Sequence, residues 1–147
     1  MTPEAKLRIA WLLLCAAVAL HVADEAVHDF LAVYNPTVIA MRHSVPWVPL
    51  PVFTFREWIA GLVLAILVGV AATPFISRIR PTAYVVAILM IANGLQHTLG
   101  TIFGRTVPSV HFPRPMPGFY SSPVLIAASI YMLIELRRVS KASGNTR

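Results

Sequence analysis

The residues of this sequence that are best suited to chemistry lie together in one short part of an apolar stretch. Residues 21–29 read HVADEAVHD and include three of the six acidic residues and two of the five histidines. Four of them follow one another at spacings of three and four residues: His21, Asp24, Glu25 and His28. Residues at these spacings project from one side of an α-helix. The pattern therefore predicts a helix that carries a single stripe of imidazoles and carboxylates.

A second polar stripe is expected on a later helix. Residues 93–97 read NGLQH, so Asn93 and His97 are four positions apart and share a helix face. His21 and His97 each lie about 14 residues, roughly 21 Å at 1.5 Å per residue, from the start of their apolar runs. The two histidines can therefore meet at one depth if the helices pack side by side.

Imidazole and carboxylate groups together suit zinc, iron or manganese. We expect a single Zn or Fe ion with an open coordination position for water. Its candidate ligands are His21, His97 and either Glu25 or His28. Glu25 and His28 have the Glu-x-x-His spacing of dimetal helical bundles, but such bundles need two copies and the sequence has one.

A site without metal is the alternative chemistry. Buried carboxylates such as Asp24 and Glu25 would donate protons, and neighbouring histidines such as His97 would take them back. This pairing is similar in kind to membrane isomerases and cyclases that protonate a lipophilic alkene or epoxide. Asn93 would be a further polar group in that site.

Two explanations without chemistry compete with a functional site. A helix crosses a bilayer in about twenty residues, so Glu25, His28 and Asp29 could stand at the outer surface as a solvated helix end. Polar groups can also hydrogen-bond one another and hold two membrane helices together. Against the first explanation, His21 and His97 lie too deep. Against the second, fewer polar residues would suffice.

The composition of the whole chain indicates a bilayer as its solvent. Of 147 residues, 57% are hydrophobic and only 12% are charged, in long continuous runs that do not alternate as a β-barrel requires. The net charge of +6 comes from cations between and beyond these runs, where they anchor a membrane protein, so we expect no nucleic-acid partner. Cys15 is the only cysteine, which leaves no disulfide and no thiolate metal site.

Four apolar runs predict an all-α, integral membrane four-helix bundle that forms a single domain over residues 1–147. The expected spans are about 7–33, 55–76, 82–103 and 123–136, and the loops between them are about 34–54 and 104–122. Pro36 is expected to stop the first helix, and Pro123 to occupy the first turn of the last. Arg137 and Arg138 are expected to end that last helix, followed by a short disordered tail.

The distribution of cations predicts the direction of the spans. Eight Lys and Arg residues lie at the two ends and in the turn between the second and third spans, against four in the two long loops. The positive-inside rule then places both the N- and C-termini in the cytoplasm and both proline-rich loops outside. We expect a multi-pass protein of the cell membrane, of the bacterial inner-membrane type.

The sequence resembles a family of small bacterial membrane proteins named for its HXXEE motif. The likeness is carried by His21-x-x-Asp24-Glu25, by Asn93-x-x-Gln96-His97 and by residues 114–121, RPMPGFYS, which are similar to the family's Arg, Pro-Gly and Ser/Thr segment before its last helix. The sequence departs from the motif in having Asp24 for the first Glu. The resemblance implies that these residues form a site, but it implies no particular reaction.

From the same segment we expect Arg114, Pro117, Gly118 and Ser121 to form a turn that caps the site, with Arg114 close to a carboxylate of the first helix. Together these features predict an intramembrane enzyme that acts on a small hydrophobic molecule reached from membrane lipid, for example by isomerisation, cyclisation or hydrolysis. A carrier of protons or metal ions and a structural membrane subunit are the alternatives. The substrate and the oligomeric state are left open.

Overall fold

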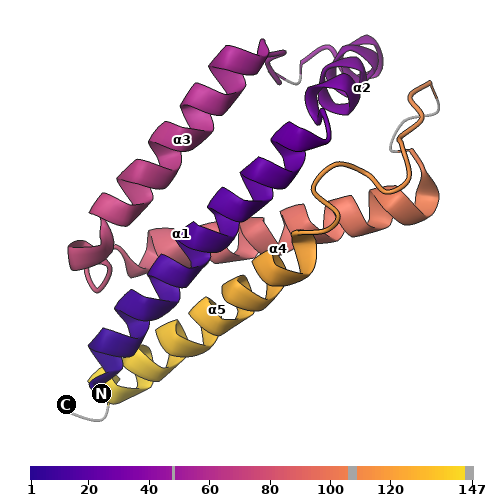
Figure 1. Cartoon of the computed structure of the whole chain (residues 1–147). Helices are drawn as coiled ribbons and strands as arrows, with labels where there is room; N and C mark the ends of the chain where they lie inside the picture. Colours follow the sequence, from indigo (N-terminus) through magenta and orange to yellow (C-terminus); the bar gives the residue numbers. More distant parts are fainter. Residues whose placement is uncertain (48, 106–108, 145–147) are drawn as a thin grey trace.

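The computed structural model describes residues 1–47, 49–105 and 109–144, and these residues form an all-α fold (Figure 1). Within this part of the chain, five α-helices follow one another as α1 (Pro3–Val27), α2 (Leu31–Ser44), α3 (Phe55–Ala71), α4 (Arg80–Phe103) and α5 (Ser122–Gly144). A 3-10 turn, η1 (Thr73–Phe75), joins α3 to α4. The expected all-α class is confirmed. The four expected spans correspond to α1, α3, α4 and α5, and α2 is a helix that the sequence pattern did not predict.

The first helix is shorter than expected, because α1 ends at Val27 and not at position 33. Asp29 follows with a φ of 54°, in the left-handed region. The N–H of Phe30 then reaches back to the carbonyl of Glu25 at 3.0 Å. A left-handed residue with such a backward bond is a common way to end a helix, and Asp is one of the few side chains that tolerate this conformation.

The helix α2 occupies the start of the loop that was expected to be irregular. Pro36 lies inside α2 instead of ending the preceding helix. A proline removes one backbone donor, and here a tertiary contact compensates. The side-chain amide of Asn35 donates to the carbonyl of Phe53 at 2.8 Å and accepts from its N–H at 3.1 Å. These two bonds fasten α2 to the segment that leads into α3.

The middle two helices match the sequence pattern closely at three of their four ends. Thr54 caps α3, since its hydroxyl oxygen accepts from the N–H of Glu57 and the Glu57 carboxylate accepts from the N–H of Thr54. Gly104, with a φ of 72°, ends α4. The exception is the end of the second span, where the helix stops at Ala71 because Pro74 belongs to η1.

The last helix begins as expected but runs beyond its expected end. Pro123 lies in the first turn of α5, and the helix continues through Arg137 and Arg138 to Gly144. Arginine is a good helix former, and cations near a helix C-terminus interact favourably with the helix dipole. A pair of arginines therefore marks the end of an apolar surface and not the end of a helix. Most of the tail that was expected to be disordered is helical, and residues 145–147 lie outside the described part.

Helix α5 packs along both α1 and α4, and α3 stands apart beside α1 (Figure 1). Gly94 of α4 permits close approach, because a Cβ there would lie 2.7 Å from a side-chain carbon of Ile126 in α5. The indole N–H of Trp11 in α1 donates to the carbonyl of Gly69 in α3 at 2.6 Å. Although α3 and α4 are both fully described, they are not closely packed against each other.

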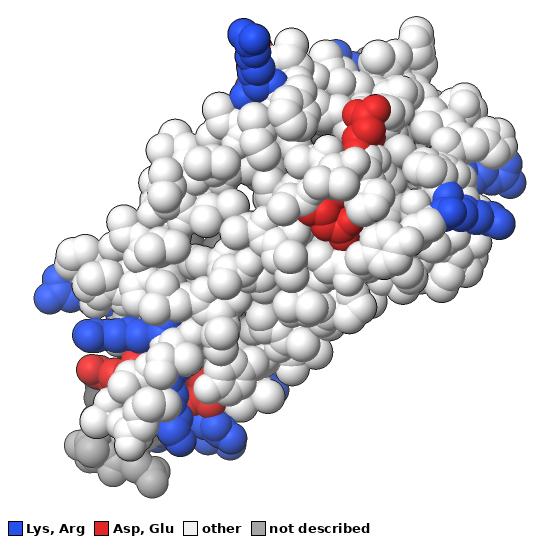
Figure 2. All heavy atoms as spheres, in the orientation of Figure 1, with Lys and Arg blue, Asp and Glu red and all other residues white. Residues whose placement is uncertain are grey.

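The outer surface of the helices is strongly apolar. On α3 alone, Val63, Leu64 and Leu67 are 45%, 62% and 60% exposed. Figure 2 shows lysine and arginine gathered at the two ends of the molecule, with an almost uncharged belt between them apart from acidic patches. By length and composition, two helices, α1 and α4, could cross a membrane.

Candidate functional site

Three buried side chains from two helices meet in the interior of the fold. His21 and Glu25 come from α1 and His97 from α4, and they are 2%, 5% and 0% exposed. Oε1 of Glu25 lies 3.1 Å from Nε2 of His97 and 3.6 Å from Nε2 of His21. One potential ligand atom from each residue lies within 4.8 Å of the others. We call these three residues the His-Glu-His cluster.

His97 has no aligned hydrogen bond within the described part of the chain. Both of its ring nitrogens are buried without a hydrogen-bond partner, although Nε2 lies close to Glu25. The ring packs beside Phe30, with ring centroids 5.7 Å apart. Buried polar atoms almost always have partners, and leaving one without costs about 1–3 kcal/mol. His97 is therefore suited to bind a further group in the cluster.

The orientation of His21 is set by a hydrogen-bonded chain that ends at Asp24. The Ser121 hydroxyl donates to Oδ2 of Asp24 at 2.7 Å, and Nδ1 of His21 lies 2.8 Å from the same hydroxyl oxygen. Since the single hydroxyl proton goes to the carboxylate, Nδ1 of His21 is the donor to Ser121. Nε2 of His21 then keeps its lone pair, which accepts from the side-chain amide of Asn93 at 3.0 Å.

This chain directs a basic nitrogen into the cluster. The backbone N–H of Ser121 also donates to Asp24 at 2.8 Å, so the carboxylate is held from two directions. In metal sites, partners of this kind fix the tautomer of a ligating histidine and turn its other nitrogen toward the ion. Nε2 of His21 faces Glu25 for the same reason.

The segment before α5 folds back along the end of α4 and covers the two histidines. The N–H of Met116 donates to the hydroxyl of Thr101 at 2.9 Å, which places the next residues over the cluster. At Gly118 the φ is +84°, and a Cβ there would lie 2.8 Å from Nδ1 of His97 and 2.9 Å from Cε1 of His21. Glycine is therefore required at this position both for its backbone conformation and for the space above the rings.

Two of the expected site residues lie outside the cluster. The side chain of His28 is 45% exposed and pairs with Asp24, whose Oδ1 lies 2.8 Å from its Nδ1. His28 leaves the polar stripe because α1 ends one residue before it. Arg114 is exposed and donates to the carbonyl of Ile102 at 3.4 Å, and no ion pair joins it to a carboxylate of the described residues.

The other expected residues lie at the cluster or next to it. Glu25 and His97 belong to it, Asn93 contacts His21, and Asp24 acts through Ser121. The explanation as a solvated helix end therefore describes His28 but not the buried Glu25. Gly118 and Ser121 were indicated only by the family resemblance. The signal that could have found them directly is a glycine after a proline, followed by serines just before a helix.

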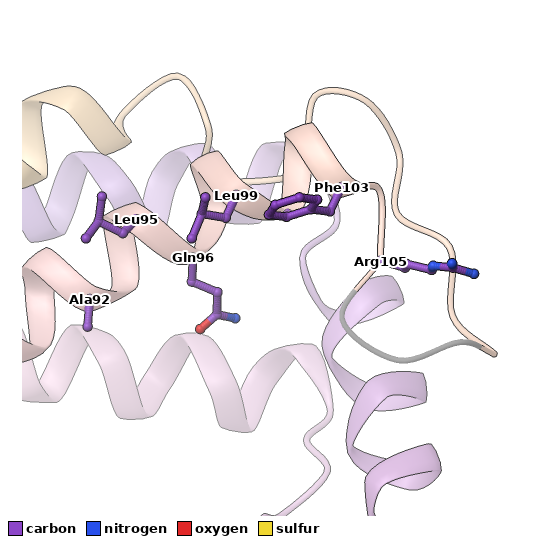
Figure 3. A pocket seen from close by; sticks show the side chains of 7 residues that line it. Ala92, Leu95, Gln96, Leu99, Phe103 and Arg105 are labelled. Carbon is purple, nitrogen blue, oxygen red and sulfur yellow. The ribbon is translucent and has the colours of Figure 1, made fainter.

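A cavity of about 410 Å³ reaches the cluster from the side of α3. It is lined by Glu25 and Asn93 together with apolar residues, among them Trp58 and Leu62. A separate hollow on α4 contains Leu95, Leu99 and Phe103 along one side of the helix (Figure 3). That hollow does not include the His-Glu-His cluster, so the first cavity is the route by which a molecule can reach Glu25.

No family model, curated protein or solved structure matches this chain. The resemblance to the HXXEE-motif family therefore stays a prediction. The site is defined by its own geometry: two histidines and one glutamate, buried, oriented by neighbouring polar groups and reached from a largely apolar cavity.

Proposed function

We propose that this protein is an intramembrane enzyme that holds a single zinc or iron ion at His21, Glu25 and His97 and acts on a small lipophilic molecule. The observation that carries the proposal is the buried His-Glu-His cluster. Two ligand atoms that each lie about 2.0–2.2 Å from a metal at a tetrahedral angle are about 3.3–3.6 Å apart. The two distances from Oε1 of Glu25, 3.1 and 3.6 Å, are close to this spacing.

The chemistry of the three donors also suits a catalytic metal. Two neutral imidazoles and one carboxylate form a common ligand set for catalytic zinc, with one position left open for water or substrate. A metal ion in such a site supplies a Lewis acid or an activated water molecule. The chain's own residues orient the ligands: Ser121 and Asp24 hold His21, and Gly118 leaves space over both rings. A metal at Nε2 of His21 would replace the bond from Asn93.

A metal-free acid–base site is the second candidate, and the contact between Glu25 and His97 favours it. Their 3.1 Å separation is short enough for a proton to pass between the carboxylate and the imidazole. A protonated Glu25 could then donate to a lipophilic substrate and recover its proton from His97. The substrate class is the same in both candidates. Measurement of bound metal distinguishes them.

Elemental analysis of the purified protein is the direct test of the metal. We expect about one zinc or iron per chain in detergent-purified protein, and we expect the His28→Ala variant to keep it. His28 is a matched control because it belongs to the same helical stripe but lies outside the cluster, with a side chain that is 45% exposed. Metal-free wild-type protein that remains folded would reject the metal and leave the acid–base candidate. Loss of metal from His28→Ala would show that the ligand set is wrong.

The proposed membrane setting places α1, α3, α4 and α5 across the bilayer with both chain ends in the cytoplasm. The start of α1 and the end of α5 lie at one end of the molecule, and α2 and the segment after α4 lie at the other (Figure 1). The exposed apolar belt and the two helices of sufficient length support this arrangement. The excess of cations beside the chain ends points to the cytoplasm for that end.

Cysteine labelling in intact cells tests this topology. In a Cys15→Ala background, a membrane-impermeant maleimide should label Ser44→Cys at the end of α2, and it should label Ala142→Cys in α5 only after the cells are opened. Both positions are exposed, so their access depends on the side of the membrane and not on burial. Labelling of Ala142→Cys alone in intact cells would reverse the topology, and labelling of both would exclude a common cytoplasmic side for the chain ends.

A further inference from the structure

The cavity that reaches the His-Glu-His cluster continues along α1 as a second, almost wholly apolar cavity. The second cavity has a volume of about 370 Å³ and shares Leu62 of α3 and Met90 of α4 with the first. Its wall from α1 includes Trp11 and Val18. Each volume is within the range of small-molecule sites, about 300–1,000 Å³. The two cavities lie end to end and form one elongated space, which we call the α1–α3–α4 groove.

The length of this groove suits a hydrocarbon chain. Glu25 lines one end and Trp11 the other. They are about 14 residues apart on one helix, which corresponds to roughly 21 Å at 1.5 Å per residue. Thr82 is the only residue with a polar side-chain oxygen or nitrogen, besides Trp11, among those that line the inner cavity. An extended apolar molecule is therefore the shape and polarity that the inner cavity accommodates.

The polar end of the groove selects an uncharged head group. Its hydrogen-bonding side chains are the carboxyl of Glu25 and the amides of Asn93 and Gln96. No lysine or arginine is among the residues that line either cavity. A phosphate or carboxylate placed there would lose its hydration without gaining a cation, which is costly in an apolar site. A hydroxyl or carbonyl oxygen can instead bond to the amides.

The groove lies where two helices diverge. Helix α3 packs on α1 and on η1 but not closely on α4, and from the turn that joins them α3 and α4 separate along their length (Figure 1). The proposed membrane setting makes this divergence a lateral passage between the groove and the lipid. A molecule dissolved in the bilayer can then reach Glu25 without crossing water.

From these observations we propose that the substrate is an elongated, uncharged lipophile with one hydrogen-bonding head group, such as a long-chain or isoprenoid alcohol. It passes between α3 and α4, places its chain in the α1–α3–α4 groove and presents its head group to Glu25, Asn93 and Gln96. This inference rests on the proposed function for its reaction. Its binding geometry can be tested without turnover and without metal.

Tryptophan quenching by a brominated chain tests occupation of the groove. Trp11 and Trp58 line the groove, and Trp47, which is 82% exposed, can be removed as Trp47→Phe. In lipid nanodiscs, 9,10-dibromostearyl alcohol should quench the two remaining tryptophans saturably. The same chain with a carboxylate head, 9,10-dibromostearate at a pH where it is ionised, should bind at least about ten-fold more weakly because an anion has no partner in the groove.

Two matched pairs of variants locate the bound chain. Ala65→Phe and Val86→Phe fill the inner cavity from α3 and α4, and each should weaken quenching by the alcohol at least about ten-fold. Ala60→Phe and Val85→Phe add the same ring at exposed positions that line neither cavity, and they should bind as wild type does. A thermal melt on all four shows which variants are folded, and the two pairs make the result independent of any one substitution.

The outcomes separate this inference from the proposed metal site. Folded Ala65→Phe or Val86→Phe that keeps its metal but no longer binds the alcohol supports the groove. Unchanged binding in both folded variants, or equal binding of the alcohol and the carboxylate, overturns the inference and leaves the metal site standing. Saturable, groove-dependent binding of the alcohol to a wild-type protein without metal rejects the metal alone.

Discussion

His21→Ala, Glu25→Gln and His97→Ala are each expected to reduce bound metal to below about a tenth of the wild-type value, with no further loss when two are combined. Residues that act as a unit lose nearly all of their function at the first substitution. The three side chains are all buried, and their ligand atoms lie within 4.8 Å of one another, so none can be replaced by a neighbour or by bulk water. Metal content per chain, measured by elemental analysis, reports the effect.

The thermal stability of these variants in detergent is expected to stay close to that of wild type. Glu25→Gln removes a buried carboxyl group together with its contact to His97, so the lost contact is offset by the lower cost of burial. His97→Ala removes two ring nitrogens that have no hydrogen-bond partner among the described residues. His21→Ala breaks bonds to Ser121 and Asn93 and should be the least stable of the three.

The same measurements distinguish a functional site from polar groups that only hold the helices together. If the cluster serves to hold α1 against α4, the single variants should lower the melting temperature and leave metal content or turnover unchanged. Loss of stability without loss of function would therefore lead us to abandon the site. A Glu25→Gln variant that changes neither quantity would show that the carboxylate takes part in neither role.

Gly118→Ala is expected to abolish metal binding and to destabilise the fold. The added Cβ would lie 2.8 Å from Nδ1 of His97 and 2.9 Å from Cε1 of His21, so both rings must move. A non-glycine residue at a φ of +84° also carries a conformational cost of about 1–2 kcal/mol. The displaced rings lose their geometry toward Glu25, and metal content should fall at least about ten-fold, as it does when the support of a metal ligand is lost.

Two other glycines provide controls for this substitution. Gly104→Ala introduces similar backbone strain, at a φ of +72°, but its Cβ would meet the side chain of Arg114 and not a histidine. It should lower stability and leave metal content unchanged. Gly61→Ala, in the middle of α3 with nothing within 4 Å, should be neutral or stabilising by about 0.5–1 kcal/mol. Equal loss of metal from Gly118→Ala and Gly104→Ala would show that strain alone, and not the place of Gly118 above the rings, disturbs the site.

The sequence by itself was sufficient to predict the helical class and the central pairing of the site. Spacing on a helix is regular, so the alignment of His21 with Glu25 and the matched depth of His97 could be calculated without a structure. Local signals also predicted two helix ends, at Thr54 and at Gly104, because a capping box and a C-terminal glycine act within a few residues.

Other features were decided by tertiary structure, and each involves a choice that neighbouring residues alone do not make. Asp29 adopts a left-handed conformation that many aspartates do not, and it removes His28 from the site. Pro36 is accommodated inside α2 by contacts of Asn35 with Phe53, seventeen positions and more along the chain. Composition reports what a segment can do, whereas these outcomes depend on which distant groups it meets.

The cover of the site and its route of access depend most strongly on long-range packing. Ser121 reaches His21 and Asp24, and Gly118 covers the histidines, because the segment after α4 folds back onto the end of that helix. The groove exists because α3 packs on α1 and leaves α4. Periodicity determines which face of a helix is apolar, but the partner of that face is chosen by the free energy of packing the whole chain, which no local pattern contains.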